Sequence, residues 1–127
     1  MEKKSHIKLE DLLIYKLARE ISKISWEIYN GLDWREKKFI GDQFIQSSDS
    51  IGANIAEAYG RFHYLDRVKF CYNSRGSLIE CSHWVGLMRE RKIGNQELLE
   101  KLQRLLKEEE VKLNNYIKSI YKSKNAS

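Results

Sequence analysis

Proline is absent from this 127-residue sequence, and glycine occurs only seven times. Proline breaks helices, so its absence permits helices of many turns. The sequence also lacks any apolar run of about eighteen residues, so we expect no membrane span. Its polar, basic start has no apolar segment of the kind found in signal peptides, which predicts a cytoplasmic protein.

Only two cysteines are present, Cys71 and Cys81, which excludes a disulfide framework. They lie ten residues apart on one expected helix, and this spacing separates them by about 15 Å along the helix axis. A disulfide requires Cα atoms within about 7 Å of each other. We therefore expect two free, buried thiols in a reducing compartment.

Strong helix formers are abundant, and apolar residues recur at helical spacing. Gly31 and Gly60 are placed to end helices, Asp33 and Glu36 form a capping-box-like pattern, and Asn95 can cap a last helix. The expected helices span approximately residues 9–30, 34–59, 64–91 and 95–121. Because the loops are short, neighbouring helices should be antiparallel. We predict an all-α, up-down-up-down four-helix bundle in a single domain.

Apolar spacing predicts which side of each helix faces the core. In the first two helices the expected core residues are Leu9, Leu13, Leu17, Ile21, Ile24, Ile28, Ile40, Phe44, Ile51 and Ile55. In the last two they are Leu65, Val68, Tyr72, Ile79, Leu87, Leu98, Leu102, Leu105, Leu106, Leu113, Tyr116, Ile117 and Ile120. Gly76 is expected to allow a close helix approach, because a mid-helix glycine otherwise costs about 1 kcal/mol. The polar residues after Tyr121 are expected to be disordered.

The second expected helix has an interrupted apolar stripe. Residues 39–60 read FIGDQFIQSSDSIGANIAEAYG, with small and polar residues among the apolar ones. Small residues let another backbone approach closely. The segment therefore predicts tight packing and a polar layer, either inside the bundle or at an oligomer interface. It predicts an assembly and does not by itself predict a reaction.

One polar cluster admits two interpretations. Asn54, Glu57 and Arg61 are spaced at i, i+3 and i+7, so they share a helix face. Ser77 and Glu80 could meet them from the third helix. One interpretation is an active site with Glu57 or Glu80 as the base. The other, which we favour, is a buried polar network that fixes helix register or a subunit interface, because no nucleophile or metal set converges there.

Metal sites and a helical ribonuclease site are not expected. The soft metal ligands are His63, Cys71, Cys81 and His83, and their spacing matches no zinc motif. No ExxH motif of a di-iron bundle is present. Helical ribonucleases of the HEPN type place four to six residues between an arginine and a histidine, whereas Arg75 and His83 have seven between them and Arg61 and His63 have one. We expect no metal and no cofactor.

The charge balance is basic, with a net charge of +5 and a pI near 9.2. The excess is concentrated in residues 64–93, which carry six positive and three negative charges. The candidate nucleic-acid-binding residues are Arg61, Arg67, Lys69, Arg75, Arg89, Arg91 and Lys92. A structural reason competes at the end of the third helix, where the helix dipole favours cations. Since no base-reading motif is visible, any binding of nucleic acid would be electrostatic and tolerant of sequence.

Aromatic side chains offer a second route to nucleic acid, because bases stack on aromatic rings. The candidates are Trp26, Trp34, Trp84, Tyr59, Tyr64 and Tyr72. At helical spacing such residues more often fill cores and interfaces, and we favour that role for them.

The second and third helices together resemble a known family. The matching residues are Asp42, Gln43, Ser50, Ile51, Asn54, Ile55, Ala56, Glu57, Gly60, Arg61, Gly76, Ser77 and Glu80. This pattern resembles the 23S rRNA intervening-sequence proteins, to which the accessory variability protein of diversity-generating retroelements is similar. The resemblance implies a four-helix bundle that assembles as a ring, typically a homopentamer, with a basic surface that can engage nucleic acid. It implies no catalytic activity.

Together these observations predict a non-enzymatic, homo-oligomeric bundle, expected to be a pentamer, that binds RNA or DNA non-specifically. The polar residues Asp42, Gln43, Asn54, Glu57, Ser77 and Glu80 are assigned to folding and assembly. An alternative is a scaffold that recruits a protein or nucleoprotein partner, such as a reverse transcriptase. A third possibility is an unrecognised enzyme that uses Glu57 or Glu80.

Overall fold

The structure is a computed structural model that describes residues 7–126 and the side chains of residues 7–123. All regular secondary structure in this part of the chain is helical. The elements are η1 (Leu9–Asp11), α1 (Leu13–Asn30), α2 (Trp34–Glu36), η2 (Lys37–Gly41), α3 (Asp42–Tyr59), α4 (Tyr64–Arg91) and α5 (Gln96–Ala126). Since α2, η2 and α3 follow one another without a break, they form one long helix. The predicted all-α four-helix bundle is confirmed.

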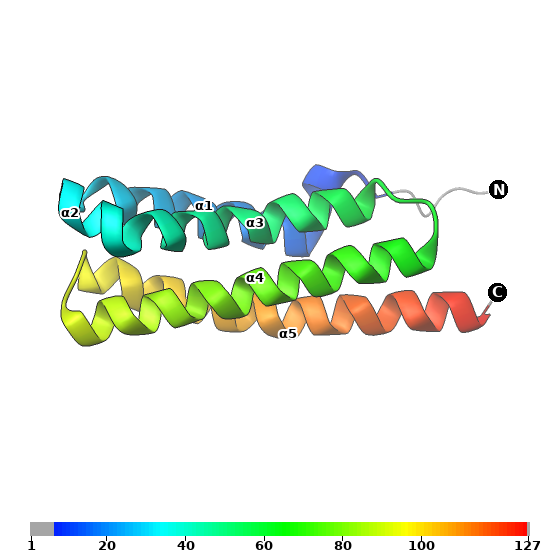
Figure 1. Cartoon of the computed structure of the whole chain (residues 1–127). Coiled ribbons are helices and arrows are strands. Elements are labelled where there is room, and N and C mark those ends of the chain that lie inside the picture. Colours follow the sequence, from blue (N-terminus) through cyan, green and yellow to red (C-terminus); the bar gives the residue numbers. More distant parts are fainter. Residues whose placement is uncertain (1–6, 127) are drawn as a thin grey trace.

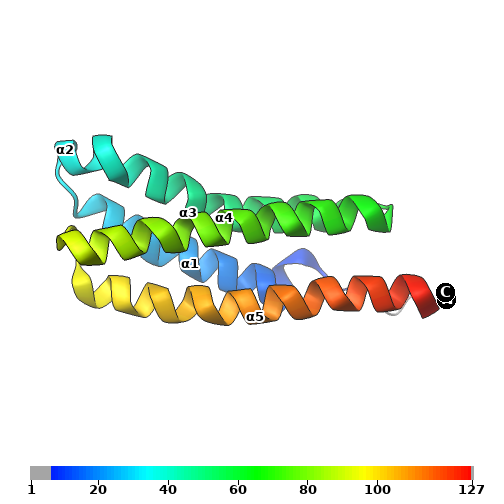
Figure 2. The ribbon, with the colours of Figure 1, turned by 60° about the horizontal axis from the view of Figure 1, so that its bottom comes forward.

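Consecutive long helices run in opposite directions (Figure 1, Figure 2). α1 packs against α3, α3 against α4 and α4 against α5, and α1 closes the bundle against α5. The start of α1 and the end of α5 lie at the same end of the bundle, as an up-down-up-down order requires (Figure 1). We call this the α3–α4 end, because it also carries the turn between these helices, and we call the opposite end the α2 end. No helix within residues 7–126 is both long and apolar enough to cross a membrane.

The first expected helix is interrupted at Leu12, and its core face differs from the predicted one. Leu12 has extended backbone angles between η1 and α1. The buried residues of α1 are Ile14, Ala18, Ile21, Ile24, Ser25 and Ile28. Leu13, expected in the core, is 50% exposed, and Leu9 and Leu17 are half-buried. Successive steps of four residues turn the side chain by about 40° each, so Leu13 drifts away from the face that Ile21 sets.

The second long helix begins as its sequence predicts. The Glu36 backbone N–H donates to Asp33 Oδ1 at 2.8 Å, and the Asp33 N–H donates to Glu36 Oε1 at 3.0 Å. This is a complete capping box. The π turn η2 follows, and Gly41 at its end is buried. A Cβ atom on Gly41 would lie 2.8 Å from Leu32 Cδ1, so glycine is needed for this close approach.

The core face predicted for α3 is confirmed, and the one predicted for α4 is wrong in part. Ile40, Phe44, Ile51 and Ile55 are all buried. The buried residues of α4 are Val68, Cys71, Ser74, Leu78, Cys81, Val85 and Met88. Leu65 is 64% exposed, Ile79 is 52% exposed, and Tyr72 is also exposed. Cys71, Ser74 and Cys81 share the inner face with larger apolar residues, whereas Leu65, Tyr72 and Ile79 lie outside.

Gly76 does not mediate a close approach within the chain. A Cβ atom placed on Gly76 or on Gly86 would meet no described atom within 4 Å. Both glycines therefore face open space, so Gly76 meets no helix of the same bundle, and a close approach of a helix from another copy stays a prediction. The reason is again the rotation of α4, which turns Gly76 outward together with Tyr72 and Ile79.

The turn between α4 and α5 contains two residues with positive φ. Lys92 ends α4 in the left-handed conformation, with φ at 59°, and Gly94 has φ at 86°. The Ile93 N–H donates to the Met88 carbonyl at 2.9 Å, and so caps the helix end. Asn95 Oδ1 accepts the Leu98 N–H at 3.0 Å, as its predicted cap requires.

The last helix is longer than expected. α5 continues to Ala126, so the prediction of disorder directly after Tyr121 is wrong. No proline or glycine follows Tyr121, so nothing in the sequence breaks the helix there. Lysine near a helix C-terminus is also favoured by the helix dipole.

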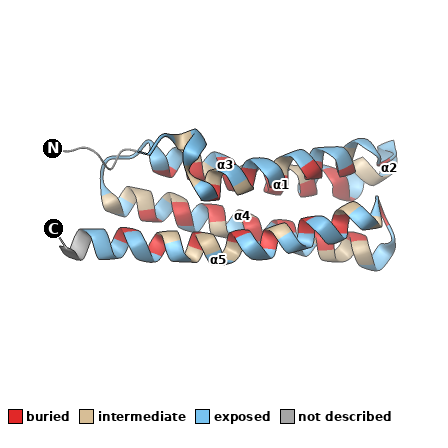
Figure 3. Ribbon diagram, turned by 180° about the vertical axis from the view of Figure 1, so that it is seen from behind, coloured by how far each residue is buried: buried red, intermediate tan, exposed pale blue. Residues whose placement is uncertain are grey.

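Buried residues line the inner sides of the four helices (Figure 3). A layer of serines lies among them. Ser48 Oγ of α3 donates to Ser25 Oγ of α1 at 2.7 Å, and Ser74 Oγ of α4 donates to the Ile51 carbonyl of α3 at 2.8 Å. These bonds join three helices. The polar layer predicted for the second helix is therefore present, although serines form it rather than the amide and acidic residues.

Glu109 of α5 is the buried polar residue that the sequence pattern missed. Its side chain is 0% exposed, and neither carboxyl oxygen has a hydrogen-bond partner among the described residues. Burial, together with the neighbouring Glu108 charge, raises the pKa of Glu109 to about 9. The group is therefore a neutral carboxylic acid at pH 7. It occupies a place in the stripe between Leu106 and Leu113 where an apolar residue is expected.

Both cysteines are free and buried. Burial raises the pKa of Cys71 to about 11, with the Arg67 charge acting in the opposite direction. Burial raises the pKa of Cys81 to about 12, although hydrogen bonds from Ser47 and Ser48 act to lower it. Both thiols therefore remain protonated at neutral pH, which makes them poor nucleophiles and poor metal ligands.

Candidate nucleic-acid interface

The cations predicted to bind nucleic acid form two separate groups along α4. The first group is Arg61, Arg67, Lys69 and Arg75, and the second is Arg89, Arg91 and Lys92. α4 is 28 residues long, a length of about 42 Å. The first group lies toward the α3–α4 end of the bundle and the second at the α2 end, so the two do not form one patch.

In the first group, Arg61 is partly neutralised. Its Nη2 atom lies 2.5 Å from Glu57 Oε2, one turn earlier in the chain. The guanidinium also lies over the Phe70 ring, with Cζ 4.7 Å from the ring centroid. Lys69 Nζ lies 5.7 Å from the centroid of the same ring. Local contacts therefore hold these cations close to the helix.

Arg67 and Arg75 are half-buried. The Arg75 Cζ atom lies 6.0 Å from the Tyr72 ring centroid, and its Nε atom is buried without a partner among the described residues. A buried N–H without an acceptor carries a cost in free energy.

Of the second group, Arg89 lines a groove between α4 and α5 toward the α2 end. Arg89 Nη1 donates to Gln103 Oε1 at 2.5 Å and so ties the two helices together. The open groove has a volume of about 530 Å³, and its walls are Ser82, Arg89, Glu100, Gln103, Arg104, Lys107 and Glu110. Arg104 pairs with Glu100 at 3.7 Å. Arg91 and Lys92 are exposed at the end of α4.

Arg104 and Lys107 of this groove are not among the cations predicted from the sequence to bind nucleic acid. They follow Arg89 by fifteen and eighteen residues, and only the antiparallel pairing of α4 and α5 brings them beside it. Their spacing of three residues on one helix face was the available signal.

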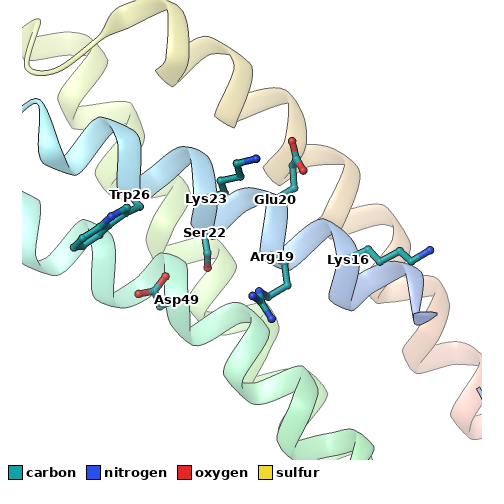
Figure 4. A pocket seen from close by; sticks show the side chains of 7 residues that line it. All are labelled: Lys16, Arg19, Glu20, Ser22, Lys23, Trp26 and Asp49. Carbon is teal, nitrogen blue, oxygen red and sulfur yellow. The ribbon is translucent and has the colours of Figure 1, made fainter. Parts of the chain in front are cut away.

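A second groove, also missed, lies between α1 and α3. Its volume is about 460 Å³, and its lining residues are Lys16, Arg19, Glu20, Ser22, Lys23, Trp26 and Asp49. Arg19, Ser22 and Trp26 lie on the side of α1 that faces Asp49 of α3, whereas Lys23 and Glu20 point away from it (Figure 4). The recurrence of Lys16, Arg19 and Lys23 at i, i+3 and i+7 was the signal for this basic face.

Two of the tryptophans expected to fill the core or an interface lie outside the core of the single chain, and their role in an interface stays a prediction. Trp26 is 54% exposed and Trp34 is 73% exposed. Trp84 and Tyr64 are half-buried against the core, whereas Tyr59 and Tyr72 are exposed. Large rings recur with the helical period on outer faces as well, so spacing alone does not separate core rings from surface rings.

The polar residues assigned to folding and assembly do not form a buried network within one chain. Asp42, Gln43, Glu57 and Glu80 are exposed, and Asn54 and Ser77 are half-buried. Asn54 Nδ2 donates to the Ser50 carbonyl at 2.9 Å, and Glu80 accepts a hydrogen bond from Trp84 Nε1 at 3.2 Å. These two bonds close within a single helix, whereas Asp42 Oδ1 accepts the Tyr29 hydroxyl of α1 at 2.6 Å and so joins two helices. Their role in contacts between copies stays a prediction.

Neither carboxylate considered as a catalytic base has the surroundings of one. Glu57 pairs with Arg61, and Glu80 binds Trp84, each in an exposed position on its own helix. No three His, Cys, Asp or Glu side chains among the described residues are grouped so that they could hold a metal ion. The described residues form two cation-lined grooves.

A solved structure of another protein shares this fold. A crystal structure of a protein of unknown function from the S23 ribosomal protein family of Bacteroides thetaiotaomicron superposes with a TM-score of 0.76. It shares 23% sequence identity, and the match covers 83% of this chain and 98% of that one. No curated protein sequence matches. The family model described as 23S rRNA-intervening sequence protein matches residues 10–115. The chain therefore belongs to the family of 23S rRNA-intervening sequence proteins.

Proposed function

We propose that the protein is a non-enzymatic, homo-oligomeric bundle that binds RNA or DNA through its basic surface, without reading sequence. The observation that supports this proposal is that few of the described cations are paired with a carboxylate of the same chain. Among the side chains of residues 7–123, ion pairs are limited to Arg61 with Glu57 and Arg104 with Glu100. Most cations are therefore available to a polyanion, and phosphate contacts of this kind supply most of non-specific binding.

The groove between α4 and α5 is the best-supported place for phosphate. Arg89 is already oriented by its bond to Gln103, so its guanidinium loses little freedom on binding. Lys107 lies on the same groove, and Arg91 and Lys92 extend the basic surface beyond its end. The acids Glu100 and Glu110 limit the affinity of any one site. Repetition of the groove around an oligomer would compensate for this weakness.

Filter binding over a range of salt concentrations tests the proposal. The affinity for RNA and DNA should fall steeply as salt rises, with little dependence on sequence. Replacing Arg91→Ala together with Lys107→Ala should lower affinity several-fold and reduce the salt slope by about 0.7 to 0.9 for each lost phosphate contact. Lys8→Ala, which removes one exposed charge outside the groove, is the control. Affinity that is indifferent to salt would contradict the proposal.

Self-association is proposed through the outer face of α4, which consists of Leu65, Tyr72, Gly76, Ile79 and Gly86. The three large side chains are exposed at seven-residue intervals, and the two glycines leave open space between and beyond them. Exposed apolar residues on one face, with small residues beside them, suit contact with another helix. A ring of five copies, which the family resemblance implies, is proposed on this basis.

Light scattering tests the assembly. We expect a mass near five chains of 15.1 kDa for the wild-type protein. Ile79→Glu should reduce the mass toward one chain, because it places a charge in the apolar contact. Val111→Glu, which changes an equally exposed residue of α5, should leave the mass unchanged. A wild-type protein that is monomeric would exclude this interface.

A second function is favoured by the α3–α4 turn. Phe62 is 91% exposed there, and Leu65 lies beside it at the start of α4. Such residues suit recruitment of a protein partner, such as the reverse transcriptase of a diversity-generating retroelement. A reverse transcriptase gene with a variable repeat next to this gene would favour recruitment, and a location inside an rRNA gene would argue against it. Loss of partner binding in Phe62→Ala would identify the surface.

A further inference from the structure

The outer side of α1 combines cations with an exposed aromatic ring in one groove. Lys16, Arg19 and Lys23 line it together with Trp26, and none of the three cations forms an ion pair with a described carboxylate. Arg19 Nη1 instead donates to Tyr15 Oη at 3.0 Å, and its guanidinium lies 5.7 Å from the Tyr15 ring. The guanidinium is therefore held in place while its charge remains available.

Trp26 is fixed as a stacking platform. Its ring lies on the Tyr29 ring, with centroids 5.6 Å apart and planes inclined by 14°. Tyr29 Oη donates to Asp42 Oδ1 at 2.6 Å, and Lys37 Nζ lies 5.0 Å from the Tyr29 ring centroid. The stack is thus anchored from α3 and from the turn before it. Since Trp26 remains 54% exposed, its indole can accept a further ring.

The acidic groups of the groove distinguish between possible ligands. Asp49 lies on the α3 side, facing Arg19, Ser22 and Trp26, and Glu20 lies on the far side of α1 (Figure 4). The groove has three cations and two carboxylates, so its net positive charge is small. A duplex would bring two strands of phosphates to the groove, which this small charge does not favour. A carboxylate can, however, accept hydrogen bonds from the N–H groups of an unpaired base, such as the amino group of cytosine or the ring N–H of uracil. Bases of a duplex are already stacked and paired, so they cannot reach Trp26.

We propose that this groove binds single-stranded nucleic acid, with phosphates on Lys16, Arg19 and Lys23, a base stacked on Trp26, and Asp49 as an acceptor for the N–H groups of unpaired bases. The inference rests on the proposed nucleic-acid binding and adds to it a second site and a preference for unpaired strands. Arg19 and Trp26 are seven residues apart, about 10 Å along the helix. The groove therefore spans a few nucleotides.

Tryptophan fluorescence tests the site directly. In a Trp34→Phe, Trp84→Phe protein, Trp26 is the remaining tryptophan. A 12-nucleotide oligouridylate should quench its emission, whereas an RNA duplex of the same length should not. Trp26→Ala in the natural sequence should weaken oligouridylate binding about 10-fold, since a base stacked on an aromatic ring contributes that much. The variant should fold normally because the ring is exposed.

Two matched variants serve as controls. Phe62→Ala removes an exposed ring at the other end of the bundle and should leave oligouridylate affinity unchanged. Arg19→Ala should reduce the salt slope by about 0.7, as the loss of one single-strand phosphate contact requires, whereas Lys8→Ala should not.

The outcomes separate this inference from the proposed function. If the protein binds nucleic acid in a salt-dependent manner but Trp26→Ala behaves like wild type, the α1 groove is not the site and the proposed function stands. Equal quenching by duplex and single strand would also overturn the inference, because a stacked base must be unpaired. If neither probe binds at low salt, the proposed function itself fails.

Discussion

The serine layer between α1 and α3 and the Glu109 carboxyl of α5 are both buried, yet they differ in how their polar atoms are satisfied. Ser48 donates to Ser25 at 2.7 Å, whereas both oxygens of Glu109 lack partners among the described residues. A hydrogen-bonded hydroxyl pair contributes a modest net stabilisation of about 1 kcal/mol. An unpartnered carboxyl instead avoids the larger cost of a buried charge by remaining protonated.

The comparison shows two ways in which one core tolerates polar groups. The serines join α1, α3 and α4 by specific bonds, so they can specify how these helices pack. Glu109 makes no such bond among the described residues, and its raised pKa makes the free energy of unfolding depend on pH. Three measurements would test this difference between the serines and Glu109.

The largest effect is expected from Glu109→Leu. Keeping the carboxyl protonated at pH 8 against an unfolded pKa of 4.5 costs a few kcal/mol, and leucine removes that cost. We expect the variant to be more stable by roughly 2 to 4 kcal/mol in urea unfolding at pH 8. Glu108→Leu, at an exposed neighbouring position, should change stability by less than about 0.5 kcal/mol. Destabilisation by Glu109→Leu would mean that the carboxyl has a stabilising partner.

A second test is the pH profile of stability. The folded pKa of Glu109 is raised to about 9, so the folded chain retains a proton that the unfolded chain releases above pH 4.5. The stability contribution of this proton is complete below pH 4.5 and is lost as pH rises toward 9. The slope is at most about 1.4 kcal/mol per pH unit. Glu109→Gln should remove this slope, and identical profiles for variant and wild type would refute the assignment.

The smallest effect concerns the serine pair. Ser25→Ala leaves Ser48 without its acceptor, and Ser48→Ala removes a donor to Ser25 and a contact with Cys81. Each should cost about 1 kcal/mol, with Ser48→Ala the more damaging. The double variant should cost less than the sum of the two, by about 0.5 to 1 kcal/mol of coupling. Strict additivity in unfolding experiments would mean that the bond contributes nothing.

The helices of this protein were largely predictable. The Asp33 and Glu36 capping box, the Asn95 cap and the buried Ile40, Phe44, Ile51 and Ile55 are where the sequence places them. Such features depend on residues within about four positions of one another, so a linear reading contains the necessary information. The core face of α4 was less predictable, because Cys71, Ser74 and Cys81 share its inner side with apolar residues while Leu65, Tyr72 and Ile79 lie outside.

The candidate sites were predictable only in part. Arg89 was identified from the charge excess, but Gln103, Arg104 and Lys107 join it from another helix. The α1 groove needs Asp49 from α3, and the burial of Glu109 depends on how α5 packs into the bundle. None of these relations involves neighbours in the sequence.

By itself the sequence determined the number of long helices, their antiparallel order, their caps, the basic charge and the absence of a disulfide. Local hydrogen bonds, short loops and composition set these properties. Only the tertiary structure decided that Trp26 lies outside, that Glu109 lies inside and that the predicted cations of α4 divide between two regions. The rotation of each helix about its own axis decides these placements. This rotation depends on how well the neighbouring helices fit against that helix, and the residue pattern along one helix does not contain that information.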